Sequence, residues 1–395
     1  MTNPHSPPPP WQPLAGLRVV DFTALLPGPF LTAMLADLGA EVVKVEPPGG
    51  ESGRRYQPDM FRAVNRGKRS VALDLKTQAG QTVAHRLAAN ADVAVESSRP
   101  GVAARLGIGW ADLRAINPRL VYCSLSSYGQ DGPWRDHPAH DINIVAASGG
   151  LGLPGHWNRP PSRLSMPFAD FAAGSMAATA ILAALRERDR TGQGTYLDLG
   201  LFEAALYCAA MRHGAEEPAD PRGHLSPVND SFETADGRWI ALGLLEDHFW
   251  ARFRDAVKDD APDLADPAFD TNEGRRAAGD RLSARVAAVM RARTLADWLR
   301  RLRAADLPAE PCLTPAEAVA SEQAAARGLV TRTADGAVHV AFPARAGGRL
   351  ARVQGPPPAV GADAETVLEA LGYAPGDIDA LRAAGAFGAM GGRKP

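Results

Sequence analysis

Among the side chains whose types can exchange a proton, three stand out by their position in the sequence: His140, Asp170 and Glu246. The ordinary pKa of histidine suits proton transfer near neutral pH. Asp170 directly precedes a long Ala-rich stretch of helical character, so its carboxylate would lie beside free backbone N–H groups, which can also stabilise a nascent oxyanion. Each residue also has an ordinary structural role, because a lone histidine is usually structural, Asp170 suits a helix N-cap and Glu246 suits a first helical turn. Both kinds of role stay open at this point.

Basic residues gather in the first third of the chain, near the ends of predicted strands. Open α/β sheets bind ligands beyond the carboxyl ends of their strands. Taken one at a time, such residues usually belong to a solvated surface. Taken together, they suit the phosphates of a nucleotide-like cofactor. The basic cluster consists of Arg62, Arg66, Lys68, Arg69, Lys76, Arg99 and Arg105.

Several common site motifs are missing or incomplete. Gly150, Gly152 and Gly155 have the spacing of a dinucleotide fingerprint, but no clear strand precedes them and Pro154 interrupts them, so we expect a loop. The sequence contains no phosphate-binding P-loop, no HExxH zinc motif and no GxSxG nucleophile elbow. Its three cysteines lie far apart without a CxxC pair, which argues against a disulfide framework or a metal site and favours a reducing setting.

The elements that must position these residues begin with a regular alternation in the first third of the chain. Strand-like apolar runs cover residues 17–22, 41–46, 70–75, 92–97 and 120–126, and helix-like segments lie at 30–38 and 77–90. This β-α-β alternation predicts a parallel, doubly wound sheet of the Rossmann-like α/β class.

The second half of the chain has a different character. Around residues 210–228 the composition shifts to Pro, Gly, Glu and Asp, and beyond them Asp236-Gly237 marks a hairpin turn that mostly helical segments follow. A strand-like run and a final helix then follow, which resemble the α/β pattern of the first third of the chain. We therefore expect a large α/β domain over 14–215 and 330–395, a smaller α+β domain over 225–325, and linkers at 216–224 and 326–329.

The composition is that of a globular protein whose positive and negative charges nearly balance, so its overall electrostatic field is weak. The 395 residues include 43 Lys and Arg against 45 Asp and Glu, so a bulk attraction to nucleic acid or an anionic membrane is excluded. The proline-rich residues 1–13 lack the apolar core of a signal peptide and should form a disordered tail, and no later run has 18 consecutive apolar residues. We therefore expect a cytoplasmic protein without nucleic-acid or membrane partners.

Long stretches of the sequence resemble the family III CoA transferases, the CaiB/BaiF superfamily, and within it the α-methylacyl-CoA racemases. The resemblance covers nearly the whole chain from Leu14 to the C-terminal helix. It implies an interlocked homodimer in which each chain leaves the large domain and returns to it. The stretches that carry it are LAGLRVVDFTALLPGPFLTAMLADLGAEVVKVEPPGG, NRGKRSVALDLK, SSRPGVAARLGIGW, YGQDGPW, ADFAAGSMAATAILAALRERDRTGQG and TADGRWIALG.

The resemblance implies roles for the three proton-exchanging residues. Asp170 matches the aspartate that the transferases use as a nucleophile and the racemases use as a base. His140, in the segment AHDIN, matches the racemases' second base in a GHDIN-like segment, with Ala139 in place of glycine. Glu246 matches a glutamate that supports this histidine. One departure is SPVN at 226–229, where the racemases have APFY, so an aromatic residue near the acyl site is lost.

The same resemblance implies that coenzyme A is part of the substrate and that no prosthetic group or metal is needed. The implied function is an acyl-CoA racemase or epimerase that acts by 1,1-proton transfer at the α-carbon of a 2-methylacyl-CoA through an enolate. The first N–H groups of the helix at Asp170 would stabilise the enolate oxygen. The alternative is a CoA transferase with an aspartyl-CoA intermediate at Asp170, and a third possibility is a catalytically silent CoA-binding protein. Coenzyme A would be held by Leu73, Leu75, Lys76, Ser97, Arg99 and Arg105.

Overall fold

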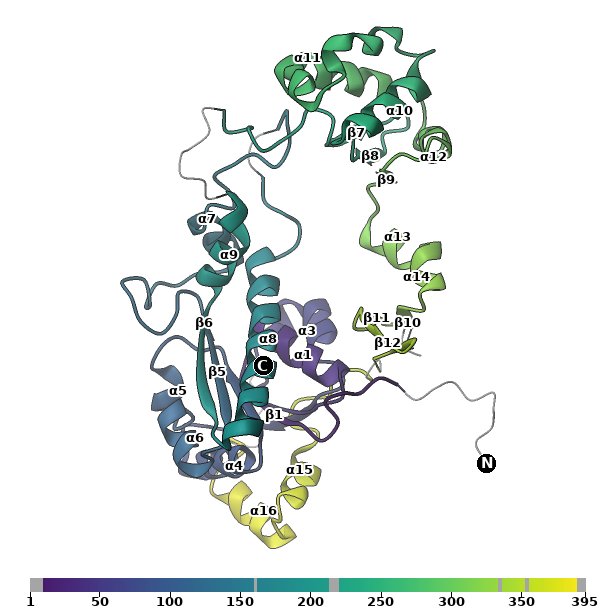
Figure 1. Ribbon diagram of the computed structural model, residues 1–395. Helices are drawn as coiled ribbons and strands as arrows, with labels where there is room; N and C mark the ends of the chain where they lie inside the picture. Colours follow the sequence, from purple (N-terminus) through teal and green to yellow (C-terminus); the bar gives the residue numbers. More distant parts are fainter. Residues whose placement is uncertain (1–9, 160–161, 213–219, 333–335, 352–354, 389–395) are drawn as a thin grey trace, which may run out of the picture. The chain divides into compact units, whose positions relative to one another are not determined.

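The chain forms two compact units in the computed structural model, which describes residues 10–159, 162–212, 220–332, 336–351 and 355–388 (Figure 1). Unit 1 comprises Met1–Ser148, Met166–Ala210 and Ala325–Pro395. Unit 2 comprises Gly149–Ser165 and Met211–Ala324. The chain therefore leaves unit 1 twice and returns to it both times.

Residues 149–165 lie in unit 2, whereas the sequence analysis assigned them to the large domain. Hydrogen bonds hold this segment there. The Asp230 carboxylate accepts from the backbone N–H of Trp157 at 2.8 Å, and the indole N–H of Trp157 donates to Asp280 at 2.9 Å. The glycines 150, 152 and 155 lie in turns of this segment, as expected for a loop.

A parallel sheet of six strands forms the centre of unit 1, with the order β3-β2-β1-β4-β5-β6. This is the strand order of a doubly wound Rossmann-like sheet, so the predicted fold class of this part is confirmed. The strands read as short apolar runs because both faces of such a sheet are covered. They are β1 (Arg18–Asp21), β2 (Glu41–Glu46), β3 (Arg69–Ala72), β4 (Val93–Glu96), β5 (Val121–Ser126) and β6 (Thr195–Gly200).

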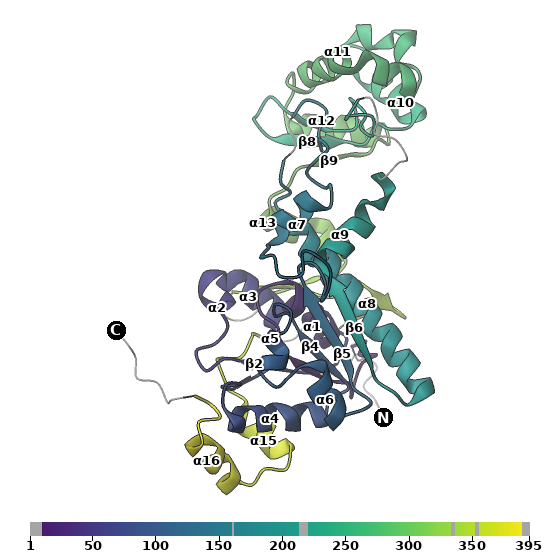
Figure 2. The ribbon, with the colours of Figure 1, turned by 90° about the vertical axis from the view of Figure 1, so that its left-hand side faces the viewer.

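Helices lie on both faces of this sheet (Figures 1 and 2). On one face, α1 packs against α8 so closely that a Cβ added at Gly174 would lie 2.9 Å from a ring carbon of Phe30. On the other, apolar side chains of α4, α6 and α15 join those of the strands in one buried cluster. The helices named here are α1 (Pro27–Asp37), α4 (Gln78–Ala89), α6 (Trp110–Ile116), α8 (Phe168–Thr191) and α15 (Ala364–Ala370).

Shorter elements complete unit 1. Two small antiparallel pairs, β10 with β11 and β12 with β13, follow the return of the chain from unit 2. The remaining elements are α2 (Gly53–Tyr56), α3 (Pro58–Asn65), α5 (Val102–Arg105), α7 (Asp141–Ala147), α9 (Leu201–Ala209), α16 (Pro375–Ala383), β10 (Val330–Arg332), β11 (Val338–Val340), β12 (Arg345–Ala346) and β13 (Arg349–Leu350).

The C-terminal part of the chain covers the free edge of β3. The backbone N–H of Ser70 donates to the Asp363 carboxylate at 2.8 Å, and the Ser70 hydroxyl oxygen accepts from the N–H of Gly361 at 2.9 Å. Val367 and Leu368 of α15 enter the same apolar cluster as the strands. Residues that are almost 300 positions apart in sequence therefore complete one edge of the sheet.

The prediction of a disordered tail over 1–13 is wrong for its last residues, while residues 1–9 lie outside the described part of the chain. The backbone N–H of Trp11 donates to the carbonyl of Leu350 at 2.9 Å, in a short parallel bridge to Ala351. The tail is therefore anchored to the returning chain from Trp11 onward, because a non-local strand supplies the partner that the prolines cannot.

The predicted linkers are also more structured than expected. Within 216–224, residues 220–224 are described, and there Arg222 donates to the Asp280 carboxylate at 2.6 Å. Within 326–329, the carbonyl of Leu329 accepts from the N–H of Ala341 at 2.8 Å. Both segments are held by partners that are distant in sequence.

Unit 2 is a small α+β arrangement. The predicted hairpin is present, since β7 (Ser231–Glu233) and β8 (Trp239–Leu242) pair antiparallel around Gly237, whose φ is +70°. The third strand is β9 (Ala309–Pro311). Helices α10 (Asp247–Val257), α11 (Asn272–Met290) and α12 (Leu295–Ala304) bury Trp250 and Trp298 against these strands. Two short helices, α13 (Pro315–Val319) and α14 (Glu322–Ala326), follow.

By length and composition, α8 alone among the described helices would be long and apolar enough to cross a membrane. One stripe of it is buried in unit 1, including Ala173, Ala177 and Ile181, and the helix also contacts β5, β6 and α9. This is the environment of a core helix.

Candidate active site

Asp170 lies in the first turn of α8, but it is not the N-cap that the sequence analysis allowed. The helix begins two residues earlier, at Phe168, after Pro167. The cap comes from Asp141, whose Oδ1 accepts from the backbone N–H of Ala169 at 2.7 Å and from that of Asp170 at 3.4 Å. The carboxylate of Asp170 therefore does not serve as the cap of α8.

His140 is placed at the start of the neighbouring helix, α7. It occupies the N-cap position, and its backbone N–H donates to the side-chain oxygen of Asn143 at 3.0 Å. Its side chain is exposed in the single chain. The next residue is Asp141, which is buried and bonded to the start of α8. Asp141 thus joins the two helix starts that carry His140 and Asp170.

The environment of Asp170 changes its acidity. Burial raises the pKa of Asp170 to about 7, and the negative charge of Asp141 adds to this shift. A carboxyl group of this kind exchanges its proton in the neutral range, where a general base is most useful.

The expectation that the first N–H groups of this helix stabilise an enolate oxygen is wrong for three of them. The N–H groups of Ala169 and Asp170 are occupied by Asp141, and that of Phe171 donates to the carbonyl of Pro167 at 3.2 Å. The sequence did not show the contacts of Ala169 and Asp170, because their acceptor, Asp141, comes from another helix.

Replacing Asp141 by Asn should lower the pKa of Asp170, because a negative charge beside it disappears while its burial remains. The asparagine side chain keeps an oxygen that can accept from Ala169, so α8 should stay capped. The pH dependence of kcat/KM would move to lower pH, and Glu365→Gln, a neutralised exposed acid of unit 1, would not move it. An unchanged profile in Asp141→Asn would contradict this electrostatic coupling.

Glu246 lies in unit 2, where it is the N-cap residue of α10. Its backbone carbonyl accepts from the N–H groups of Phe249 and Trp250, both at 3.1 Å, and its side chain is exposed. This fits the ordinary role at a helix start. The role of Glu246 as a support for His140 stays a prediction.

The residues predicted to hold coenzyme A fall into two groups. Leu73 and Ser97 directly follow the carboxyl ends of β3 and β4, and the Ser97 hydroxyl oxygen accepts from the N–H of Ala24 at 3.2 Å. Leu75 is half-buried nearby in sequence. The exposed cations are Lys76, Arg99 and Arg105, and within the described ranges no acidic side chain forms an ion pair with them. These three cations are therefore available to phosphates, although binding stays a prediction.

The four other members of the basic cluster each pair with an acidic side chain. Arg66 and Lys68 are mostly buried, which leaves them less accessible to phosphates than the sequence analysis expected, whereas Arg62 and Arg69 form exposed pairs. Arg62 pairs with Asp59, and Arg66 with Asp37. Lys68 is fully buried against Asp21 at 2.9 Å, and Arg69 lies 3.4 Å from Glu41. Three of the four acids come from other strands or helices, so sequence proximity could not reveal them.

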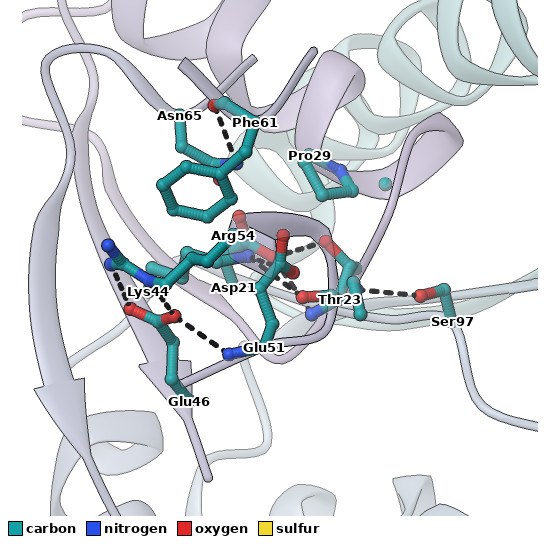
Figure 3. Close-up of polar contacts among 12 residues, drawn as sticks. Asp21, Thr23, Pro29, Lys44, Glu46, Glu51, Arg54, Phe61, Asn65 and Ser97 are labelled. Carbon is teal, nitrogen blue, oxygen red and sulfur yellow. Dashed lines mark hydrogen bonds and ion pairs between the residues drawn. The ribbon is translucent and has the colours of Figure 1, made fainter. Parts of the chain in front are cut away.

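The sequence analysis also missed a buried network of charges at the carboxyl ends of β1 and β2, drawn in part in Figure 3. A signal was present, because Asp21, Lys44 and Glu46 interrupt the otherwise apolar runs of these strands. Burial alone would raise the pKa of Asp21, but the charges of Lys68 and Lys44 and the hydrogen bonds from Thr23 and Thr32 together lower it. Burial lowers the pKa of Lys68 to about 8. The network consists of Asp21, Lys44, Glu46, Glu51, Arg54 and Lys68.

Comparison with known proteins agrees with this architecture. Residues 14–364 match CoA-transferase family III. The chain is 36% identical to acetyl-CoA:oxalate CoA-transferase from Acetobacter aceti, over 81% of this chain and 86% of that protein. It is 35% identical to α-methylacyl-CoA racemase from Mus musculus, over 78% and 79%.

A solved structure shows the same likeness. The crystal structure of a CaiB/BaiF family protein from Brucella suis superposes with a TM-score of 0.81 at 29% identity, covering 91% of this chain and 99% of that one. Together with the match over 14–364, this shows that the chain belongs to CoA-transferase family III.

Proposed function

We propose that this protein is an acyl-CoA racemase or epimerase that inverts the α-carbon of a 2-methylacyl-CoA. The observation that carries the proposal is the junction of α7 and α8, where Asp141 joins the helix starts bearing His140 and Asp170. Inversion requires one base to remove the α-proton and a second group to return a proton on the opposite face. A histidine and an aspartate whose pKa is raised to about 7 by burial suit these two tasks at neutral pH.

In the proposed reaction, the carboxylate of Asp170 takes the α-proton and the thioester becomes an enolate. The imidazolium of His140 then donates its proton to the opposite face of the same carbon. In the reverse direction the two groups exchange roles, so no proton is gained or lost overall. Because Asp141 occupies the N–H groups of Ala169 and Asp170, other donors have to stabilise the enolate oxygen.

The proposal includes a homodimer, as the family resemblance implies, with coenzyme A as part of the substrate and no prosthetic group. It also includes a cytoplasmic location, which rests on the cysteine usage of the sequence. Glu246 is proposed to orient His140 of the other subunit and to stabilise its charged form. Light scattering at micromolar concentration should give the mass of two chains. A stable monomer would contradict this part.

A CoA transferase is the second candidate, favoured by the similarity to the oxalate CoA-transferase. Here Asp170 would attack the thioester carbonyl, forming a mixed anhydride and releasing the CoA thiolate. The thiolate would attack the aspartyl carbonyl of the anhydride, which releases the free acid and leaves an aspartyl-CoA thioester. An acceptor carboxylate would then take CoA by the reverse steps.

Deuterium incorporation separates the two candidates. A racemase incubated with a 2-methylacyl-CoA in deuterated water, without an acceptor acid, should place deuterium at the α-carbon, because solvent-equilibrated bases return the proton. His140→Ala should abolish inversion. The transferase is favoured instead if hydroxylamine or borohydride traps an adduct at Asp170 while α-deuterium stays absent for straight and branched acyl groups.

Coenzyme A binding should depend on Lys76, Arg99 and Arg105. Each alanine variant should bind CoA more weakly by about 3- to 10-fold, since a charge-assisted hydrogen bond to phosphate is lost, while thermal stability stays unchanged because the side chains are exposed. Isothermal titration with CoA measures this. The control is Arg69→Ala, whose arginine faces Glu41. Unchanged affinity in all three variants would place the phosphates elsewhere.

A further inference from the structure

Charges buried at the carboxyl ends of β1 and β2 form a balanced set of three acids and three bases. The side chains of Asp21 and Lys68 are wholly inaccessible, and those of Lys44 and Glu51 nearly so, at 1% and 3% exposure. Arg54 and Glu46 form a two-pronged pair at 2.7 and 2.6 Å. Apolar residues of similar volume often stabilise a fold more than a buried ion pair does. Stability is therefore a weak explanation for this arrangement.

Three of these six charges, Asp21, Lys44 and Lys68, contact the turn that follows β1 or the start of α1. The Asp21 carboxylate accepts from both the N–H and the hydroxyl of Thr23, and Lys44 donates to the carbonyl of Thr23 at 2.9 Å. Lys68 donates to Asp21 and, at 3.0 Å, to the carbonyl of Pro29. Figure 3 shows Asp21 and its neighbours beside Thr23. Buried charges thus hold the start of the turn at Thr23 and the first turn of α1 at Pro29.

The turn itself is strained. Leu25 has a φ of +65°, a left-handed conformation that residues other than glycine rarely adopt. The turn also closes tightly, because a Cβ added at Gly28 would lie 2.3 Å from Cβ of Thr23. Strain of this kind persists only where the surroundings over-determine the backbone, and it concentrates at functional sites.

The strained turn leads to one of the residues predicted to hold coenzyme A. The N–H of Ala24 donates to the hydroxyl oxygen of Ser97 at 3.2 Å, across the carboxyl ends of β1 and β4. Since the Ser97 oxygen accepts from Ala24, its own hydrogen points elsewhere and is available to an acceptor atom of a ligand. Ser97 can therefore donate one hydrogen bond to such a ligand while it keeps its bond from Ala24.

We propose that Asp21 and Lys68 are a positioning pair, which holds the turn Thr23–Leu26 so that Ser97 donates a hydrogen bond to coenzyme A. This inference rests on the proposed function only in that the ligand is a CoA thioester. It applies equally to a racemase and to a transferase.

The test replaces the pair by neutral residues of similar shape, Asp21→Asn together with Lys68→Met. One acid and one base are removed, so the remaining Lys44, Glu51, Glu46 and Arg54 stay balanced. We expect the double variant to fold but to bind CoA about 10-fold more weakly by isothermal titration. The matched control is Asp92→Asn with Arg188→Met, a pair of unit 1 with a 2.8 Å contact at the opposite, amino end of the strands. It should bind CoA like the wild type.

A second measurement asks whether the pair acts through Ser97. Ser97→Ala should weaken CoA binding in the wild type but have little further effect in the double variant, because the serine is then no longer held. Additive effects would overturn the inference. If the double variant fails to fold, Thr23→Val, which removes only the hydroxyl bonded to Asp21, should show a smaller loss with the same non-additivity.

The outcomes distinguish this inference from the proposed function. A wild-type protein that binds no CoA would contradict the proposed function itself. A wild type that binds CoA, with a folded double variant that binds it equally well, would overturn the positioning role alone.

Discussion

Asp170→Asn is expected to lower the turnover of acyl-CoA by about 10³-fold while the protein stays folded. Asparagine has the shape of aspartate, but it can neither take a proton from the α-carbon nor attack a thioester carbonyl. The loss is therefore expected under both candidate reactions. Steady-state turnover with a 2-methylacyl-CoA measures it, and a variant within tenfold of the wild type would exclude Asp170 from the chemistry.

The same variant should change how stability depends on pH. Because burial raises the pKa of Asp170 to about 7, the folded protein keeps a proton that the unfolded chain releases above the ordinary value of 3.8. The stabilisation of the folded state by this tighter proton binding is fully present below pH 3.8, and it is lost as the pH rises through about 7. The wild type should lose stability relative to Asp170→Asn between pH 4 and 8 in urea unfolding. Asp189→Asn, near the other end of α8, should show no such trend.

Lys68→Met is expected to destabilise unit 1 by about 3–5 kcal/mol, because it removes one partner of a buried ion pair and leaves Asp21 with less compensation. Asp21 would keep its hydrogen bonds from Thr23 and Thr32, but it would lose the 2.9 Å contact with Nζ of Lys68. Urea unfolding monitored by circular dichroism measures the change.

Two further variants serve as comparisons for Lys68→Met. Arg62→Met breaks an exposed pair with Asp59 and should cost at most about 1 kcal/mol. Adding Asp21→Asn to Lys68→Met should recover part of the loss, since no lone charge then remains. Equal stability of Lys68→Met and the wild type would mean that the buried contact contributes nothing to the fold.

Local patterns in the sequence were sufficient for the central sheet. The run at residues 120–126 is mostly apolar, and that at 41–46 keeps three valines between its charges, because both faces of a parallel strand are buried. This pattern depends on few distant residues. The hairpin at Asp236-Gly237 was likewise visible, because its turn chemistry is local.

The features that the sequence analysis missed all depend on partners that are far apart in the chain. Asp141 caps a helix that begins 27 positions later, and Lys68 meets an aspartate 47 positions earlier. Nothing near Asp170 or Lys68 in the sequence indicates these partners, since tertiary folding alone brings them together. The pairing of Glu246 with His140 stays a prediction, because these residues belong to different units of the chain.

The covering of β3 by the C-terminal part of the chain has a consequence for biosynthesis. The strand leaves the ribosome early, but the residues that cap its edge, Gly361 and Asp363, emerge only after the whole of unit 2 has been made. At ~5–20 residues per second, this delay lasts on the order of tens of seconds. During that interval the nascent chain carries an open strand edge, which is a template for wrong pairing. A chain cut after residue 354 should therefore aggregate in light scattering, and a soluble, folded fragment would contradict this view of how the protein is completed.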